Sequence, residues 1–134
     1  MPIKYTEADD VKKLADEITN SLDFFHVTPQ FVYCVRSVGS KATRTIARIH
    51  GLGKIWQEAL NLAPSYIIEV ISERYDRLSK EEKEKTIIHE LLHIPKGFSG
   101  GFRPHKGYID TKTVEFLHKK LQKQRITRNI REMI

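Results

Sequence analysis

The stretch Ser79-Lys-Glu-Glu-Lys-Glu-Lys-Thr-Ile-Ile-His89-Glu90-Leu-Leu-His93-Ile-Pro95 decides how this chain is organised. A serine followed three residues later by a glutamate forms a capping box, and the closing proline cannot continue a helix, so the sequence predicts a helix from about Lys80 to Ile94. At about 100° per residue, the two histidines and the glutamate between them fall on one side of this helix. The opposite side is apolar and is expected to pack against the core: Ile87, Ile88, Leu91, Leu92 and Ile94.

The spacing of His89, Glu90 and His93 has a chemical reason. Histidines at positions i and i+4 lie one above the other on a helix, so both imidazoles can reach one metal ion, and the pattern is typical of zinc. Glu90 then lies beside the open coordination position of the metal, where a carboxylate can take a proton from water and return it to a leaving amine. The alternative is a solvated helix face with two histidines. We favour a metal site with one zinc ion per chain.

Two residues compete as the third metal ligand. His105 follows His93 by 12 positions on a glycine-rich segment that can approach the metal closely, and Glu115 follows it by 22 positions on the next predicted helix. Spacing alone permits either. We favour His105 because neutral imidazole is the commonest metal ligand among side chains. Glu115 then either orients a ligand histidine through a hydrogen bond or pairs with Lys119. His118 is expected either at the surface or in contact with a metal ligand.

Composition favours one soluble domain over residues 1–134. The chain has 134 residues, of which 40% are hydrophobic, which is enough for one core. Cys34 is the only cysteine, which excludes an intrachain disulfide and a cysteine-based zinc ribbon. No apolar run reaches the length of a signal peptide or a membrane span, so we expect a cytoplasmic protein without membrane contact.

The net charge of +6 is concentrated near the carboxyl end. Residues 116–134 carry a net charge of +5 and residues 1–115 carry +1. The tail contains one acidic residue, Glu132, and six basic residues: Lys119, Lys120, Lys123, Arg125, Arg128 and Arg131. Such a basic helical tail can contact nucleic acid weakly, or it can be a solvated helix face. The apolar spacing changes phase near Arg125, which predicts a break in the tail.

The rest of the chain predicts a small sheet with helices. A helix is expected from near Thr6 to about residue 22, and strands at 31–35, 45–49 and 66–71. A short helix at 54–60 is expected to place Trp56 in the core. His26 and His50 lie near element boundaries and are expected to be hydrogen-bonded structural residues.

These residues together resemble a known family. The segment from Ala47-Arg-Ile-His-Gly51 through the His-Glu-Leu-Leu-His motif and Ser99-Gly-Gly-Phe-Arg-Pro-His105 to Glu115 is similar to the zincin metallopeptidases. It resembles more closely the putative metallopeptidases of archaea and phages, and distantly the SprT-like proteases. The resemblance implies an α+β fold, in which a small three-stranded sheet packs against helices, and a substrate peptide that lies along the edge strand at Ile46–Ile49.

The resemblance also implies residue roles. His89, His93 and His105 hold zinc, and Glu90 is the general base of peptide hydrolysis. Arg103 and Tyr108 are candidate donors to the developing oxyanion. Alternatively, Arg103 is an exposed cation of the loop and Tyr108 is a packing aromatic residue.

Three functions are compatible with the sequence. The first is a zinc peptidase with a peptide or protein substrate, and the second is a regulator protease that cleaves a single partner. The third is a basic nucleic-acid-binding protein with a structural zinc. A structural zinc normally has four protein ligands, often cysteines, which argues against the third.

Overall fold

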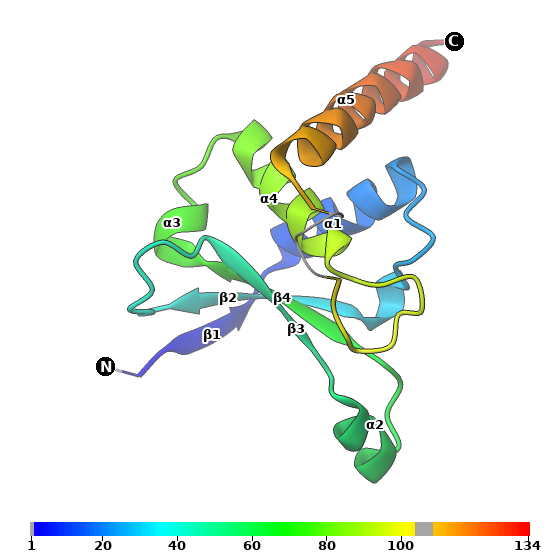
Figure 1. Ribbon diagram of the computed structural model, residues 1–134. Helices are drawn as coiled ribbons and strands as arrows, with labels where there is room; N and C mark the ends of the chain where they lie inside the picture. The colour runs from blue at the N-terminus through cyan, green and yellow to red at the C-terminus, as the bar shows by residue number, and fades with distance from the viewer. Residues whose placement is uncertain (1, 104–108) are drawn as a thin grey trace.

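The computed structural model describes residues 2–103 and 109–134. Its elements follow one another in the order β1 (Lys4–Glu7), α1 (Asp9–Ser21), a 3-10 turn (Pro29–Phe31), β2 (Val32–Val38), β3 (Ala47–Gly51), α2 (Lys54–Leu60), β4 (Tyr66–Ile71), α3 (Ser72–Tyr75), α4 (Lys80–Leu92) and α5 (Thr111–Met133). Helices α1, α4 and α5 gather on one side of a twisted sheet, while α2 projects from the far end of β3 (Figure 1). No helix of the described ranges is long and apolar enough to cross a membrane.

The sheet has four strands in the order β1-β2-β4-β3, so the expectation of three strands is wrong. The strand that was not predicted is β1, which pairs antiparallel with β2. Its four residues are all exposed, so it has no apolar face that a pattern could reveal. β2 runs parallel to β4, and β3 runs antiparallel to β4. In the described part of the chain β3 is therefore an edge strand, as expected for the segment proposed to meet a peptide.

The core lies between the sheet and the helices. Alternate residues of β2 and β4 face the helices in register, with Val32 opposite Tyr66 and Cys34 opposite Ile68. All four side chains are buried. They pack against buried apolar residues of α1 and α4, which include Val11, Ala15, Ile18, Ile87, Ile88 and Leu91. The apolar side predicted for the motif helix is thus the side that enters the core.

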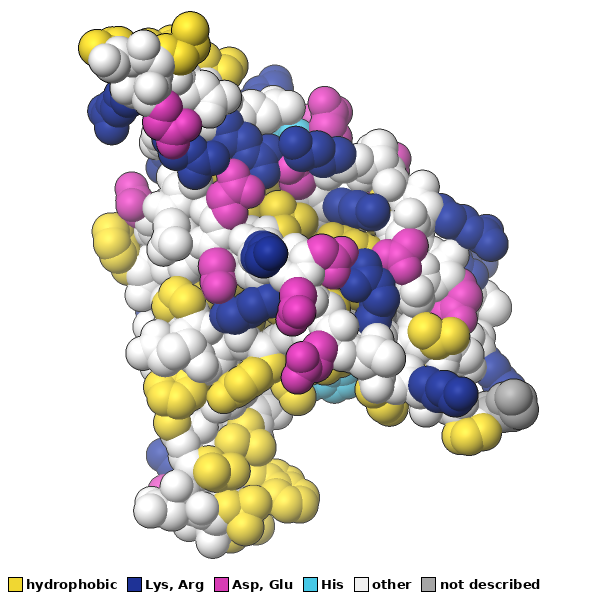
Figure 2. Space-filling model, turned by 180° about the vertical axis from the view of Figure 1, so that it is seen from behind, with side chains coloured by type: hydrophobic (Ala, Val, Ile, Leu, Met, Phe, Trp, Pro, Cys, Tyr) yellow, Lys and Arg dark blue, Asp and Glu magenta, His cyan; other side chains and the backbone are white. Residues whose placement is uncertain are grey.

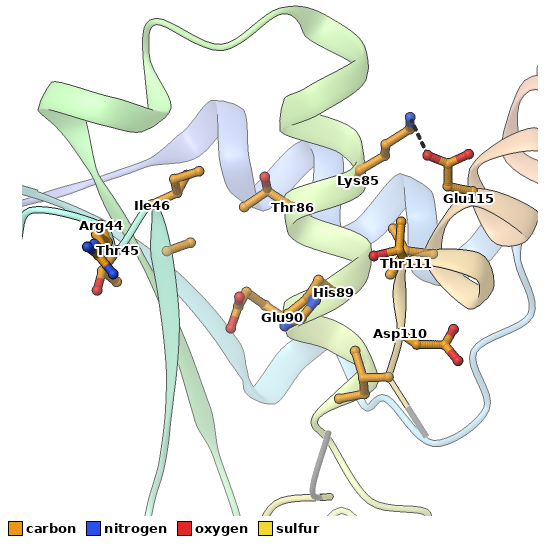
Figure 3. Close-up of a pocket in the computed structure, with 13 residues that line it drawn as sticks. Arg44, Thr45, Ile46, Lys85, Thr86, His89, Glu90, Asp110, Thr111 and Glu115 are labelled. Carbon is orange, nitrogen blue, oxygen red and sulfur yellow. Dashed lines mark hydrogen bonds and ion pairs between the residues drawn. The ribbon is translucent and has the colours of Figure 1, made fainter. Parts of the chain in front are cut away.

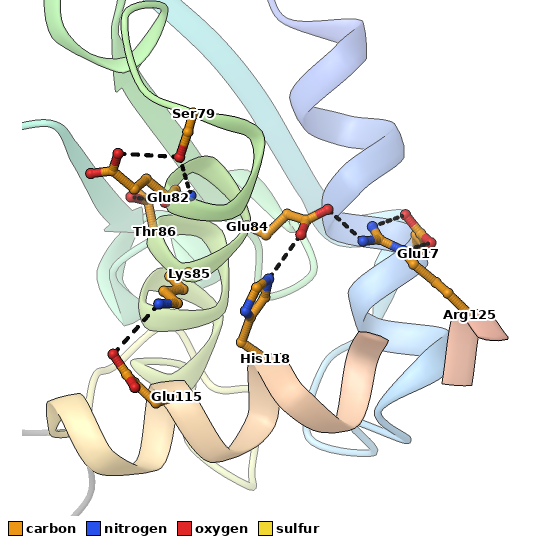
Figure 4. Close-up of polar contacts among 9 residues, drawn as sticks. All are labelled: Glu17, Ser79, Glu82, Glu84, Lys85, Thr86, Glu115, His118 and Arg125. Carbon is orange, nitrogen blue, oxygen red and sulfur yellow. Dashed lines mark hydrogen bonds and ion pairs between the residues drawn. The ribbon is translucent and has the colours of Figure 1, made fainter. Parts of the chain in front are cut away.

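Helix α4 begins as the sequence predicts. The Ser79 hydroxyl accepts a hydrogen bond from the Glu82 backbone N–H at 3.2 Å and donates one to the Glu82 carboxylate at 3.1 Å (Figure 4). The N-cap role of Ser79 is therefore confirmed, and Glu82 binds the Ser79 hydroxyl instead of completing the box through the Ser79 backbone N–H. The helix ends at Leu92, two residues before the predicted end.

Two other expectations are wrong. Trp56 is 57% exposed, because none of the residues of α2 is buried and this short helix projects from the body. The basic tail has no break near Arg125, because α5 runs without interruption to Met133. Arg125 lies where the spacing of the apolar residues changes, and its side chain forms an ion pair with Glu17 of α1 at 2.8 Å. This ion pair takes the place of an apolar contact between α5 and the rest of the fold. The later apolar residues remain exposed: Ile126, Ile130 and Met133.

Candidate active site

A groove lies between edge strand β3 and helix α4. It consists of two hollows, of about 620 and 380 Å³, which meet at Ala47, His89 and Glu90. The larger hollow continues past Ile46 to Arg44 on one side and to α5 on the other (Figure 3). The smaller hollow continues along β3 toward Phe102. The side of α4 that carries His89, Glu90 and His93 therefore faces the edge strand β3.

His89 and His93 lie next to each other along α4. Their ring centroids are 5.2 Å apart with the planes inclined by 67°, and both side chains are half-buried. Imidazoles placed in this way, one turn apart, can converge on a single ion. The predicted pairing of the two histidines on one face is therefore present in the structure.

The ring of His93 is oriented by a backbone carbonyl. Its Nδ1 lies 3.1 Å from the Arg103 carbonyl oxygen, and the Arg103 N–H donates to the His93 carbonyl at 2.7 Å. A carbonyl only accepts, so Nδ1 carries the proton and Nε2 carries the lone pair that a metal needs. The sequence pointed to the Arg103 side chain as an oxyanion donor. That side chain lines the groove, and the contribution of the backbone was not foreseen.

Glu90 is 7% exposed although it lines both hollows. Burial raises the pKa of Glu90 to about 8. A carboxyl group whose pKa is this close to neutrality can both accept and release a proton near physiological pH. Glu90 points from α4 toward β3, into the space that the two elements enclose (Figure 3).

The segment that follows α4 is fastened to the sheet. The Tyr66 hydroxyl donates to the Gly101 carbonyl at 2.7 Å and accepts from the Gly100 N–H at 2.8 Å. The Gln57 amide donates to the Ser99 carbonyl at 2.8 Å and to the Leu52 carbonyl at 2.7 Å. These contacts fix the chain just before the glycine-rich stretch reaches residue 105.

Close backbone approach explains two glycines of this region. A Cβ on Gly51 would collide with the Gly100 carbonyl, and a Cβ on Gly100 would collide with the Leu52 carbonyl. Gly100 also has φ +97°, a conformation that favours glycine. The glycines were expected to bring this loop close to the metal. In the described residues, the close contact that they permit is with β3.

The remaining candidate residues are distributed as follows. His105 and Tyr108 lie outside the described residues. Glu115 lines the larger hollow together with His89, and its carboxylate lies 3.5 Å from the ammonium group of Lys85 rather than pairing with Lys119 (Figure 4). Within residues 2–103 and 109–134, no three His, Cys, Asp or Glu side chains are grouped so that they could hold a metal ion.

A buried polar network behind the site holds α5 against α4. His118 is 3% exposed, so of the two positions that the sequence left open, at the surface or next to a metal ligand, the surface position is wrong. Its Nε2 lies 2.9 Å from the Glu84 carboxylate, and Arg125 reaches the same carboxylate at 2.6 Å (Figure 4). Arg125 also binds Glu17 of α1. Glu84 lies on α4 five residues before His89, so this network positions the motif helix from behind.

The other two histidines behave as the sequence predicted. His26 Nε2 lies 3.1 Å from the Leu91 carbonyl, and burial lowers the pKa of His26. His50 Nε2 lies 2.8 Å from the Glu69 carboxylate on the other face of the sheet. Both are hydrogen-bonded structural residues.

Comparison with known families agrees with the site. A family model described as putative phage metallopeptidase matches residues 3–126, which include the strands, the motif helix and most of α5. The chain belongs to this family. Membership indicates a hydrolase of the metallopeptidase class, with a metal ion and a protein or peptide substrate. No curated protein and no solved structure matches the chain.

Proposed function

We propose that this protein is a zinc-dependent peptidase in which His89 and His93 bind the metal and Glu90 is the general base. The observation that carries the proposal is the position of all three residues in one groove, against the edge strand β3. An extended peptide can add to such an edge through backbone hydrogen bonds, which would carry it past Glu90. A peptidase with many substrates and a regulator protease that cleaves a single partner would use the same groove and the same residues.

The residues present fit a zinc ion. Two imidazoles on adjacent turns supply nitrogen donors, and the Arg103 carbonyl holds the His93 ring in the tautomer that leaves Nε2 for a metal. When bound, zinc supplies Lewis-acid chemistry, because it lowers the pKa of water and polarises a carbonyl group.

Glu90 performs the proton transfers in this proposal. Its carboxylate takes a proton from the attacking water and delivers it to the nitrogen of the leaving amine. Glu90 is 7% exposed, and its position on α4 directs it toward β3 (Figure 3).

We favour His105 as third ligand. The Arg103 backbone is bound to His93, and residue 105 follows Arg103 by two positions in the sequence. Glu115 is engaged by Lys85 and does not form a three-ligand group with the two histidines, which supports this choice.

Ligand variants test the metal site. His105→Ala should lower zinc affinity by orders of magnitude and abolish hydrolysis of a mixed peptide library, because two imidazoles alone hold the ion weakly. Glu115→Ala should cost about 10-fold or less, as expected for a residue outside the ligand set. Zinc content, chelator competition and hydrolysis are measured on the same samples. A Glu115 variant without metal beside a His105 variant that keeps it would reverse the assignment.

A further inference from the structure

Beyond Ile46 the groove opens into another hollow, which is basic. This hollow of about 560 Å³ lies between the segment that precedes β3 and helix α3, and Ile46 is shared with the larger hollow of the candidate active site. Three cationic side chains line it, Lys41, Arg74 and Arg77. Arg44 lines the adjoining end of the active-site groove, so positive charge continues from one hollow into the next.

The positive charge of this region is largely uncompensated. Glu73 is the one carboxylate among the described residues that line the basic hollow, and it accepts a hydrogen bond from the Gly39 N–H at 2.8 Å. Arg74 donates to the Ala42 carbonyl at 3.2 Å, which fixes its guanidinium in the wall. In the part of the chain that the structure describes, Lys41 and Arg44 form no ion pair or side-chain hydrogen bond. The Gly39 hydrogen bond and the charge of Arg77 both help to lower the pKa of Glu73, without a direct ion pair between the two side chains.

The position of the hollow points to a polypeptide ligand. A peptide paired with β3 would leave the strand at Ala47, next to the segment that contains Arg44, and Lys41 lies six residues from Ala47, at most about 20 Å along the chain because this segment is bent. The basic end of α5 lies on the opposite side of the molecule from α3 (Figure 1). The basic tail and this hollow are therefore two separate positively charged surfaces.

We propose that the basic hollow, with Arg44, binds acidic side chains of the substrate, a few residues from the bond that is cleaved. The proposal rests on the proposed peptidase function and gives its substrate class: polypeptides with a cluster of Asp or Glu on one side of the cleavage site. Carboxylates can form charge-assisted hydrogen bonds with the guanidinium groups of Arg44 and Arg77. The contribution of these pairs to peptide binding should decrease as the salt concentration rises.

Binding to an inactive variant tests the proposal without any need for cleavage. The zinc-loaded Glu90→Gln protein is titrated into two fluorescein-labelled dodecapeptide pools, in which an Asp-Glu-Asp-Glu block stands before or after eight mixed positions. Matched pools carry Asn-Gln-Asn-Gln. We expect the acidic pools to bind about 10-fold more tightly or better, with the preference concentrated in one of the two orders. Arg44→Glu and Arg77→Glu, each in the Glu90→Gln background, should abolish this preference, and Lys54→Glu on α2 should retain it.

Equal binding of acidic and amide pools overturns the proposal, as does an equal loss in the Lys54 control. Displacement of the acidic pool by a 20-base-pair DNA duplex, with the same dependence on Arg77, would assign the hollow to phosphate instead. If acidic peptides bind as expected while the wild-type protein cleaves none of them, the peptidase function fails and the acidic-ligand site stands.

Discussion

The imidazole of His93 links the motif helix to the loop that follows it. One ring nitrogen faces the Arg103 carbonyl, and the backbone of the same two residues is joined by a second hydrogen bond. A residue that the sequence marks as a metal ligand therefore also fixes the start of the segment that contains His105. The motif alone predicted the first role. The second depends on how the chain turns after Pro95, which a spacing cannot show.

Glu69 gives a prediction about pH. Its side chain is 3% exposed and is held by Arg48 at 2.8 Å and by His50 at 2.8 Å. Burial alone would raise the pKa of Glu69, but the hydrogen bonds from Arg48 and His50, together with the charge of Arg48, help to lower the pKa from 4.5 to about 2. Because the folded-state pKa lies below the unfolded value, the stabilisation is complete well above pH 4.5 and is lost as the pH falls toward 2.

The measurement compares the wild type with Glu69→Gln by urea unfolding between pH 7 and pH 3. The difference in the free energy of unfolding should narrow by about 2 kcal/mol over this range, because the stabilising charge is lost only from the wild type. A difference that stays constant with pH would show that the Glu69 carboxylate does not anchor β3 to β4.

At the scale of elements, the site depends on the contacts between the loop after α4 and the sheet. Tyr66 begins β4, and its hydroxyl bonds two consecutive residues of the loop. Its ring also packs edge-on against Phe98 and Phe102. The loop is thus held by a strand far from the motif in sequence, and Tyr66 in the sequence reads only as part of an apolar strand.

Tyr66→Phe tests the importance of this contact for metal binding. The variant keeps the ring packing and loses both hydroxyl hydrogen bonds, so zinc affinity should fall about 10-fold, as for other residues that support ligands. Tyr33→Phe, on an exposed part of β2, is the matched control and should leave affinity unchanged. Chelator competition gives the affinities. If the Tyr66 variant bound zinc as tightly as the wild type, the loop would not organise the site.

The elements themselves were predictable to different degrees. The capping box and apolar spacing predicted α4 to within two residues, because both signals are local to the helix. β1 was missed because its four exposed residues form a strand only through pairing with β2. The continuity of α5 depends on Arg125, whose partners Glu17 and Glu84 lie far away in sequence. Such contacts between distant segments have no local signature.

At the scale of the whole molecule, two exposed surfaces with apolar side chains project from different ends of the fold. The exposed end of α5 combines cations with apolar side chains, and a separate apolar surface projects at α2 (Figure 2). The α2 surface contains Ile55, Trp56, Leu60 and Leu62. Two of the six tail cations already form ion pairs within the chain, because Arg125 and the more exposed Arg128 both bind Glu17. The tail is therefore less available to a polyanion than its sequence indicates.

The remaining tail cations predict a weak contact with nucleic acid. Replacement of Lys119, Lys120 and Lys123 by Gln should abolish a weak, salt-sensitive and sequence-independent binding to duplex DNA, because phosphate contacts release counterions. Arg125 is kept, since its loss would disturb the packing of α5. Fluorescence anisotropy at two salt concentrations measures the effect. Equal binding of DNA by the variant and the wild type would show that these three lysines do not contact nucleic acid.

The central claim is that Glu90 is the general base of a zinc peptidase. The most direct test measures hydrolysis of a mixed peptide library by the wild type and by Glu90→Gln, both with zinc content verified, and with chelated wild type beside them. The amide cannot accept a proton, so the account predicts full zinc occupancy in the variant and a loss of turnover of about 100-fold or more. Near-wild-type turnover in zinc-loaded Glu90→Gln, or cleavage that persists after the metal is removed, would contradict it.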